Sequence, residues 1–375
     1  MPFILDLAIL FITAVIGGRL VRKLGQPPSL GEMLVGIIIG PYALGVVTYT
    51  DTLRTFAELG SIFLLFIIGL KTAIESFYSV WKPAIAAGVG GAIVPFFLGF
   101  LAASSFGFTI AESLFLGAVL TATSIGITAR VLSDMHKLNT KEGVTILGAA
   151  VADDVVGIIV LTVILGVIAG GLTLISVVSI TAKAILAWFL ILLIGMRIIA
   201  RVFNKIKLNE GALTLIFLAT CLGFAFVTSQ LGLSSIVGAF AIGLALSRTF
   251  KVKEALQELN IIYRVFVPIF FISIGLLVDI SVFLKALPLG LLVTVLAIAG
   301  KLIGCGVVVF LMGFKLNEAL RVGIGMIPRG EMGLIIAGIG LTSGLIGSEI
   351  YSIGVIAIVL TTFLAIPLMK PTFGK

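Results

Sequence analysis

Charged residues are scarce in this sequence. Only 11% of its 375 residues are Asp, Glu, Lys or Arg, whereas ordinary soluble domains have about 25%. A water-soluble globule needs charged side chains to cover its surface. The composition therefore excludes a soluble enzyme, a disordered protein and a nucleic-acid-binding protein. With 60% hydrophobic residues, the chain has the composition of a polytopic membrane protein.

Cysteine and histidine are almost absent. Cys221 and Cys305 lie in apolar stretches, and their spacing predicts neither a disulfide framework nor a metal site. The single histidine, His136, lies in a polar segment beside Lys137; it is a solvated loop residue or, alternatively, a pH sensor. The sequence has no Ser/His/Asp set, metal-ligand cluster or phosphate-binding loop. We therefore expect no enzymatic activity and no cofactor.

Long apolar runs occupy nearly the whole chain. A transmembrane helix needs about 20 apolar residues, and charged or Pro/Gly-rich segments divide the sequence into thirteen candidates. These are residues 3–22, 29–47, 56–70, 83–105, 112–134, 143–168, 181–203, 211–230, 233–248, 262–284, 288–312, 318–343 and 349–370. Basic residues follow the first run instead of preceding it, so we expect a retained span and not a cleaved signal peptide.

Basic residues are distributed unevenly between alternate loops. If the N-terminus is outside, the outer loops hold only Arg54, Lys183 and Lys285 of the 25 basic residues, and 20 of the others lie in inner loops or at the C-terminus. Cytoplasmic loops of membrane proteins are enriched in Lys and Arg. The pattern predicts a multi-pass protein of the cell (inner, cytoplasmic) membrane with its N-terminus outside and its C-terminus cytoplasmic. It also accounts for the net charge of +8 without an acidic partner.

Five charged residues fall inside apolar runs: Asp153, Asp154, Lys301, Arg329 and Glu331. A charge at the centre of a membrane helix costs about 2.5–3.5 kcal/mol on insertion scales, so such residues are kept mainly where they pair, face a cavity or carry ions. At about 1.5 Å per residue, the aspartates and the lysine lie roughly 15–20 Å into their spans, near the midplane. We expect a buried ionic site; an ion pair that only joins two helices is the alternative.

Two spans contain helix-breaking residues at this same depth. The span 112–134 has Thr123, Ser124 and Gly126 near its middle, and the span 318–343 has Pro328 and Gly330. Irregular backbone within the membrane is tolerated only where it is buried in protein or lines a cavity. Paired interrupted helices are typical of a transporter substrate site, whereas glycine-mediated helix packing is the alternative explanation.

A weak internal repeat relates the two halves of the chain. A shift of 204 residues places Thr121–Gly126 on Gly325–Gly330. An odd number of spans separates the two copies, so the second would be inverted. We expect a first repeat at 1–169, with broken helix 112–134 and the Asp-Asp helix 143–168, a linker helix at 170–209, and a second repeat at 210–375, with the Lys301 helix 288–312 and broken helix 318–343. The predicted fold class is an all-α polytopic membrane protein of about thirteen transmembrane helices, in two inverted six-helix repeats whose broken helices cross at the midplane.

Several segments resemble a known family. They are GQPPSLGEMLVGIIIGP (25–41), AELGSIFLLFIIGLKT (57–72), TATSIGITARVL (121–132), GAAVADDVVG (148–157), the GK pair at 300–301 and PRGEMGLI (328–335). In them the sequence resembles the NapA-type sodium/proton antiporters of the cation:proton antiporter family, which also includes Kef-type potassium/proton exchangers. The resemblance implies an NhaA-like fold and a homodimer, in which a mobile core containing both broken helices moves against a dimerising panel.

The resemblance also implies roles for individual residues. Asp154 is expected to bind the transported cation and to carry the proton. Asp153 is expected to form a salt bridge with Lys301 that breaks when the cation binds. An Asp-Asp pair at these positions is associated with electrogenic exchange.

The residues at the two predicted breaks are expected to support this pair. By the same resemblance, Thr123 and Ser124 contribute oxygens to the cation or hold the site in place. Arg329 and Glu331 compensate the dipoles of the half-helices and pair with neighbouring groups.

The expected function is exchange of Na⁺ (or Li⁺) for H⁺ across the lipid bilayer. Exchange of K⁺ for H⁺ in the manner of the Kef type stays open, because cation preference depends on cavity size and oxygen count. The end of the chain at Lys375, soon after the last span, favours the NapA type over Kef-type chains with a C-terminal regulatory domain. A sodium-coupled organic-anion symporter and a channel are further alternatives.

Overall fold

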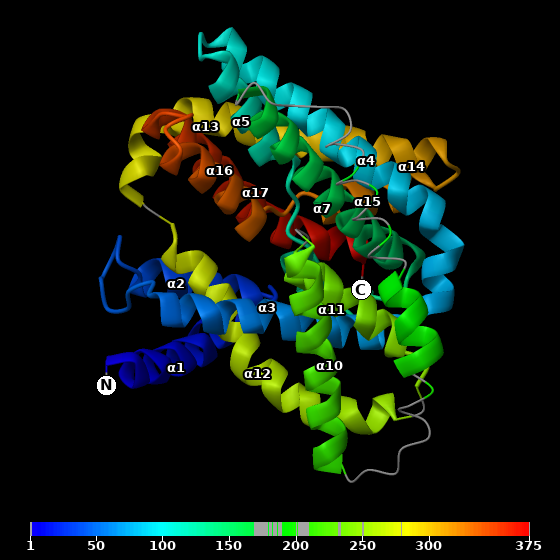
Figure 1. Cartoon of the computed structure of the whole chain (residues 1–375). Helices are drawn as coiled ribbons and strands as arrows, with labels where there is room; N and C mark the ends of the chain where they lie inside the picture. The colour runs from blue at the N-terminus through cyan, green and yellow to red at the C-terminus, as the bar shows by residue number, and fades with distance from the viewer. Residues whose placement is uncertain are drawn as a thin grey trace. The chain divides into compact units, whose positions relative to one another are not determined.

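The computed structural model describes residues 2–168, 190–199, 210–231, 234–249, 251–278 and 280–374, and the single residues 179, 182, 186 and 201. Within them all regular secondary structure is helical (Figure 1). Nine of the described helices are long and apolar enough to cross a membrane. The predicted linker 170–209 and the predicted span 181–203 fall largely outside the described residues, so the count of thirteen spans stays a prediction.

The chain divides into two compact units, each formed by two separate stretches of sequence. Unit 1 comprises Met1–Ser79 and Ala182–Leu277, and unit 2 comprises Val80–Thr181 and Val278–Lys375. Each unit thus takes one part of each predicted repeat. The repeats were predicted from sequence similarity between the two halves, and this spatial division into units does not test them.

Unit 1 is built on close contacts between helices. Its α3 packs against α11 and α12, and its α2 packs against α1 and α12 (Figure 1). A Cβ atom added at Gly69 would lie 2.5 Å from the carbonyl oxygen of Phe240, and one at Gly36 would overlap the carbonyl oxygen of Ile272. Glycine is required at these crossings because the backbones touch. The helices of this unit are α1 (Pro2–Lys23), α2 (Pro28–Ile39), α3 (Asp51–Lys71), η1 (Gly195–Ile199, a π-helix), α10 (Glu210–Gln230), α11 (Ser235–Leu246) and α12 (Val252–Leu276).

Unit 2 contains both of the spans in which helix breaks were expected. The Asp-Asp helix α7 packs against α5, α6 and α15, and α17 packs against α13 and α16. Its helices are α4 (Ile74–Ser105, which begins just before the unit boundary), α5 (Ile110–Thr121), α6 (Ile125–Asp134), α7 (Lys141–Ile168), α13 (Ile280–Lys301), η2 (Leu302–Val307, a π-helix), α14 (Val308–Leu311), α15 (Leu316–Gly325), α16 (Glu331–Thr342) and α17 (Ser348–Phe373).

Several helices, α4 among them, begin earlier than the sequence predicts, and two of these differences have separate causes. The span expected at 262–284 is α12, which begins at Val252, and the one expected at 288–312 begins with α13 at Ile280. The first difference arises because a helix satisfies its own backbone and can carry charged turns beyond the apolar core. The second arises because Pro288 lies inside α13, where neighbouring groups can satisfy the freed carbonyl of a membrane helix.

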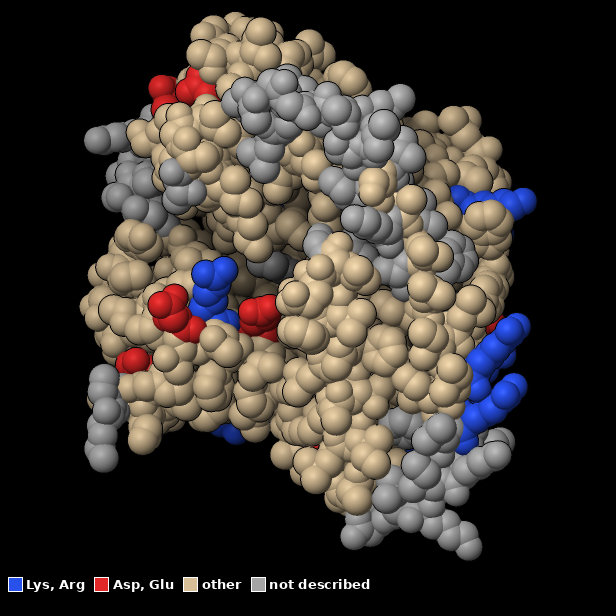
Figure 2. Space-filling model, in the orientation of Figure 1, with Lys and Arg blue, Asp and Glu red and all other residues tan. Residues whose placement is uncertain are grey.

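The molecular surface is mainly apolar. On the face in Figure 2, charged side chains gather at a few places and uncharged residues cover most of the described surface. Large apolar side chains are exposed, such as Ile4 at 67% and Leu5 at 63% on α1. Exposed apolar area of this extent is unfavourable in water but suits a lipid environment. The chain is therefore an all-helical, multi-pass membrane protein.

Candidate functional site

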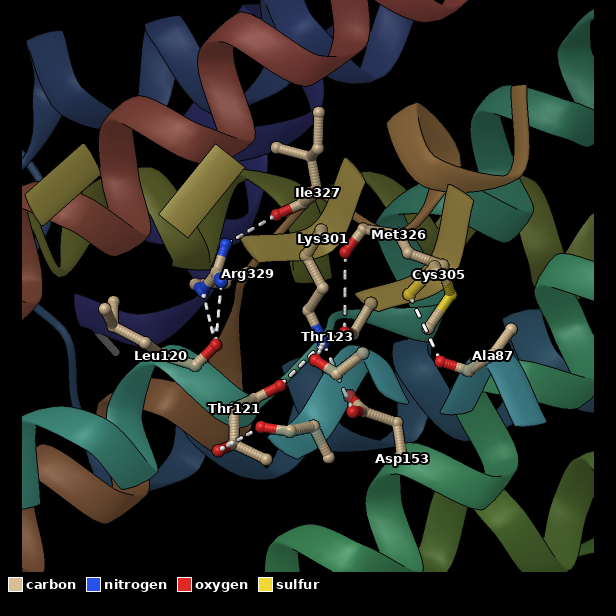
Figure 3. A network of polar contacts seen from close by, with 12 residues as sticks. Ala87, Leu120, Thr121, Thr123, Asp153, Lys301, Cys305, Met326, Ile327 and Arg329 are labelled. Atoms are coloured by element: carbon tan, nitrogen blue, oxygen red, sulfur yellow. Dashed lines mark hydrogen bonds and ion pairs between the residues drawn. The ribbon is translucent and has the colours of Figure 1, made fainter. Parts of the chain in front are cut away.

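Two interrupted helices cross inside unit 2. One interruption separates α5, which ends at Thr121, from α6, which begins at Ile125; the other occupies residues 326–330, between α15 and α16. The Ser124 amide donates a hydrogen bond of 2.8 Å to the Pro328 carbonyl. The Thr123 hydroxyl lies 3.5 Å from the Met326 carbonyl oxygen (Figure 3). Each extended segment thus supplies hydrogen-bond partners to the backbone of the other.

A helix that ends inside a membrane leaves carbonyls without intrahelical donors, and these carry partial negative charge. At the end of α15, the Gly325 carbonyl accepts a hydrogen bond of 2.7 Å from the Thr128 hydroxyl. At the end of α5, the carbonyls of Leu120 and Thr121 accept from two buried cations. The two half-helices are therefore completed by different chemistry.

Lys301 is the first of these cations, and its ammonium uses all three N–H groups. Nζ donates to the Gly91 carbonyl at 2.7 Å, to the Thr121 carbonyl at 2.8 Å and to Asp153 Oδ1 at 3.2 Å (Figure 3). Both side chains of the ion pair are completely buried. A buried ion pair is stable only when further hydrogen bonds satisfy its groups. The two carbonyls meet that requirement for the lysine.

Arg329 is the second buried cation. Its Nε and Nη2 donate to the Leu120 carbonyl at 3.2 and 2.7 Å, and its Nη1 donates to the Ile327 carbonyl at 3.0 Å (Figure 3). Nη2 also lies 3.4 Å from the Ala297 carbonyl oxygen. All these acceptors are backbone carbonyls. The planar guanidinium thus holds the carbonyl end of α5 against the second interruption.

The two aspartates differ in their surroundings. Asp153 binds Lys301 through Oδ1, and the Thr123 side chain lies against the same carboxylate. Its other oxygen, Oδ2, is buried and receives no hydrogen bond from the described residues. Asp154 follows on α7 and is 7% exposed. Side chains of consecutive helical residues point about 100° apart, so the two carboxylates face different neighbours. Carboxylate, hydroxyl and carbonyl oxygens are ligands that hard cations prefer.

The remaining predicted residues occupy different parts of the crossing. Ser124, Pro328 and Gly330 lie in the interruptions, whereas Gly126 lies inside the first turn of α6. A Cβ added at Gly330 would lie 2.8 Å from the Ser124 Oγ atom, so a side chain there would push the two segments apart. Glu331 is the first residue of α16, and its side chain is outside what the structure describes.

Sequence reasoning missed several groups that hold this arrangement together. The Thr362 hydroxyl, from α17, accepts a hydrogen bond from the Arg329 amide and donates one to the Arg329 carbonyl. The pair Thr361–Thr362 in an otherwise apolar span was a signal for such a role. The Gly91 carbonyl gave no comparable signal, because every residue has one.

Comparisons with known proteins identify related chains. A family described as sodium/hydrogen exchanger, transmembrane, matches residues 9–373. The Na⁺/H⁺-K⁺ antiporter GerN of Bacillus cereus is 35% identical over 99% of this chain and 96% of its own. A Na⁺/H⁺ antiporter of Enterococcus hirae is 36% identical over 100% of this chain and 99% of its own.

A solved structure shares the fold. The sodium proton antiporter MjNhaP1 from Methanocaldococcus jannaschii at pH 8 superposes with a TM-score of 0.75, covering 98% of this chain and 96% of that chain, at 19% identity. The full-length family match and the relatives above 30% identity identify the family. The chain belongs to the sodium/hydrogen exchanger family, whose members are secondary transporters and not enzymes.

Proposed function

We propose that this protein exchanges Na⁺ for H⁺ across the membrane as a secondary antiporter, and that Asp154 and Asp153 carry the exchanged ions. The observation that carries the proposal is the buried Lys301–Asp153 pair, with Asp154 beside it, where two interrupted helices cross. Two relatives at 35% and 36% identity, which are named as a Na⁺/H⁺-K⁺ antiporter and a Na⁺/H⁺ antiporter, support it.

In this mechanism protons and Na⁺ compete for the same carboxylates. Na⁺ displaces the proton of Asp154 and takes Asp153 away from Lys301, so the empty, unprotonated site differs in charge from the loaded one. Only the loaded or protonated site crosses. The concentration of both interrupted helices in unit 2 supports alternating access in which this unit carries the ions. If Lys301 is protonated while Na⁺ is absent and loses this proton when Na⁺ binds, then Na⁺ binding releases one proton from Asp154 and one from Lys301. Two protons then exchange for one Na⁺, and the exchange is electrogenic.

The test is exchange in proteoliposomes that contain a pH-sensitive dye. A Na⁺ gradient should drive proton movement with the unchanged protein and not with Asp154→Asn. Asp134→Asn is the matched control, since this carboxylate lies in the same unit, on α6, and is 27% exposed in a partly buried ion pair with Arg130; it should retain exchange. Exchange that persists in Asp154→Asn would refute the assignment. Acceleration of exchange when a membrane potential of the appropriate sign is imposed tests electrogenicity.

Exchange of K⁺ for H⁺ is the second candidate function. It is favoured by the similarity to GerN, which is named as a Na⁺/H⁺-K⁺ antiporter. The same proteoliposomes should be driven in parallel with Na⁺, Li⁺ and K⁺ gradients. A response to K⁺ equal to or above that to Na⁺ would make K⁺ the transported ion.

Four further features belong to the proposal. We place the chain in the NapA-type branch on the strength of the motif segments, and we propose a homodimer with the N-terminus outside and the C-terminus cytoplasmic. We also propose inverted repeats at 1–169 and 210–375, supported by helix interruptions at positions that a shift of 204 residues brings together. Labelling of single cysteines from either side of the membrane tests the orientation.

A further inference from the structure

The helix α4 approaches the Lys301 segment more closely than side chains would allow. A Cβ added at Gly91 would overlap the Cys305 sulfur, and one at Gly304 would overlap the Gly90 carbonyl oxygen. A Cβ at Gly300 would lie 3.0 Å from Pro95. The backbone of α4 is therefore exposed directly to the lysine, with no side chain between them.

Pro95 determines which backbone group of α4 is available there. In an α-helix the carbonyl of one residue accepts from the amide four residues later. The amide partner of the Gly91 carbonyl would belong to Pro95, which has no N–H. Pro95 lies inside α4 and is buried. The Gly91 carbonyl consequently lacks the amide donor of the regular helical pattern, although the helix continues past it.

Lys301 uses this free acceptor. Its Nζ lies 2.7 Å from the Gly91 carbonyl oxygen, closer than it lies to Asp153 Oδ1, at 3.2 Å. The Thr121 carbonyl, at 2.8 Å, is freed by a different device, the end of α5. Two neutral carbonyls thus surround the ammonium, and neither depends on the state of the aspartate.

We propose that Pro95 is a positioning residue for Lys301: it keeps the Gly91 carbonyl free so that the ammonium has a partner independent of Asp153. When a cation takes the Asp153 carboxylate, the Lys301 nitrogen still has two carbonyl acceptors, whereas without the Gly91 carbonyl it would have only one. Pro95 thereby lowers the cost of opening the ion pair and strengthens cation binding. This consequence for transport rests on the proposed antiport function; the positioning itself does not.

A double-mutant cycle on thermal stability tests the positioning. Pro95→Ala restores an amide that competes for the Gly91 carbonyl. It should lower the melting temperature by several degrees where Lys301 is present, and leave it unchanged or raise it in Lys301→Met, where only the helical hydrogen bond is gained. Equal shifts in the two backgrounds would overturn the proposal. If Lys301→Met does not fold, Asp153→Asn/Lys301→Met replaces it as the background, because both members of the ion pair are then removed.

Pro83→Ala is the matched control for this cycle. Pro83 is the other proline inside α4, and the substitution makes the same chemical change in the same helix. The Lys301 ammonium donates to the Gly91 carbonyl and not to the carbonyl that Pro83 frees. Its effect on the melting temperature should be the same with and without Lys301. An effect of Pro83→Ala that depends on Lys301 would mean that the cycle reports general helix changes, and would overturn the proposal.

Transport kinetics supply the second test. Pro95→Ala should raise the KM for Na⁺ about three- to tenfold, the effect of weakening a hydrogen bond to a charged group, while kcat stays nearly unchanged. A fall in kcat without a change in KM would indicate a structural role only and would refute the consequence for binding. If the unchanged protein shows no exchange, the proposed function fails, whereas the stability cycle still decides on Pro95.

Discussion

The two compact units bury their helices in different ways. In unit 1, glycines let backbones touch, as at Gly69 and Gly36. Among the described residues of this unit, Glu32 is the only buried acidic or basic residue. Unit 2 uses the same kind of glycine contact but also buries Lys301 and Arg329 completely. The difference coincides with backbone continuity, because both interrupted helices belong to unit 2.

Backbone continuity explains why the buried cations gather in one unit. A continuous helix uses most of its carbonyls internally and leaves few for a buried cation, except where a proline such as Pro95 removes a donor. An interrupted helix leaves carbonyls with partial negative charge, and Leu120 and Thr121 at the end of α5 present theirs to Arg329 and Lys301. The cations satisfy the helix end, and the helix end stabilises the cations.

The largest effect should come from replacing a buried carboxylate of unit 2, compared with the same change in unit 1. Asp154→Asn in unit 2 should abolish Na⁺/H⁺ exchange, because the carboxylate that binds both ions is lost. Glu32→Gln in unit 1 should leave exchange close to that of the unchanged protein, although Glu32 is also buried. Dye-monitored exchange in proteoliposomes measures both. Equal loss in the two variants would show that burial, and not the crossing of interrupted helices, marks a transport carboxylate.

Removal of a buried cation should have the next largest effect. Arg329→Met leaves the Leu120 and Ile327 carbonyls without the guanidinium donors and should lower the free energy of unfolding by about 2–6 kcal/mol, because each buried acceptor left without a partner costs about 1–3 kcal/mol. Arg248→Met is the control from unit 1, since the Arg248 side chain is 55% exposed in its ion pair with Glu75. Denaturant titration in detergent measures the two. A loss below that of Arg248→Met would contradict the role given to Arg329.

Glycine contacts should give an intermediate effect. Gly69→Ala in unit 1 forces a methyl group against the Phe240 carbonyl and should cost about 1–3 kcal/mol of unfolding free energy. Gly223→Ala on α10 is the control, because no atom lies within 4 Å of the added Cβ; it should stabilise the protein by about 0.5–1 kcal/mol. If the melting temperatures of Gly69→Ala and Gly223→Ala moved in the same direction, backbone contact would not be what determines the cost of the added methyl group.

The ion pairs away from the two helix interruptions should give the smallest effects. Glu75→Gln in unit 1 should change the free energy of unfolding by less than about 0.5 kcal/mol, since solvent screens exposed pairs. Glu142→Gln in unit 2 should cost more, because Glu142 is largely buried and lies 2.6 Å from Arg321 Nη1. Denaturant titration of both variants at low and high salt tests this order, and only the Glu75 effect should disappear with salt.

Part of this site could be read from the residues themselves. A charge in an apolar span is visible in any sequence, so Asp153, Asp154 and Lys301 stood out as one ionic site, and Arg329 stood out as a further charge at a helix break. Pro328 and Gly330 marked one helix interruption in the same way. The acceptors could not be read, because the Gly91, Leu120 and Thr121 carbonyls are backbone groups common to all residues. The starts of α12 at Val252 and α13 at Ile280 were missed because charge and proline do not prevent a membrane helix.

The sequence by itself determined that the chain lies in a membrane, because composition decides the solvent in which a chain can be buried. It also determined that a few charges must lie at mid-depth, since a span has a fixed length. Only the tertiary structure decided which groups satisfy those charges. Partners such as Gly91, Thr121 and Asp153 come from α4, α5 and α7, and Lys301 reaches them together only where the helices have packed and the backbone has been left open.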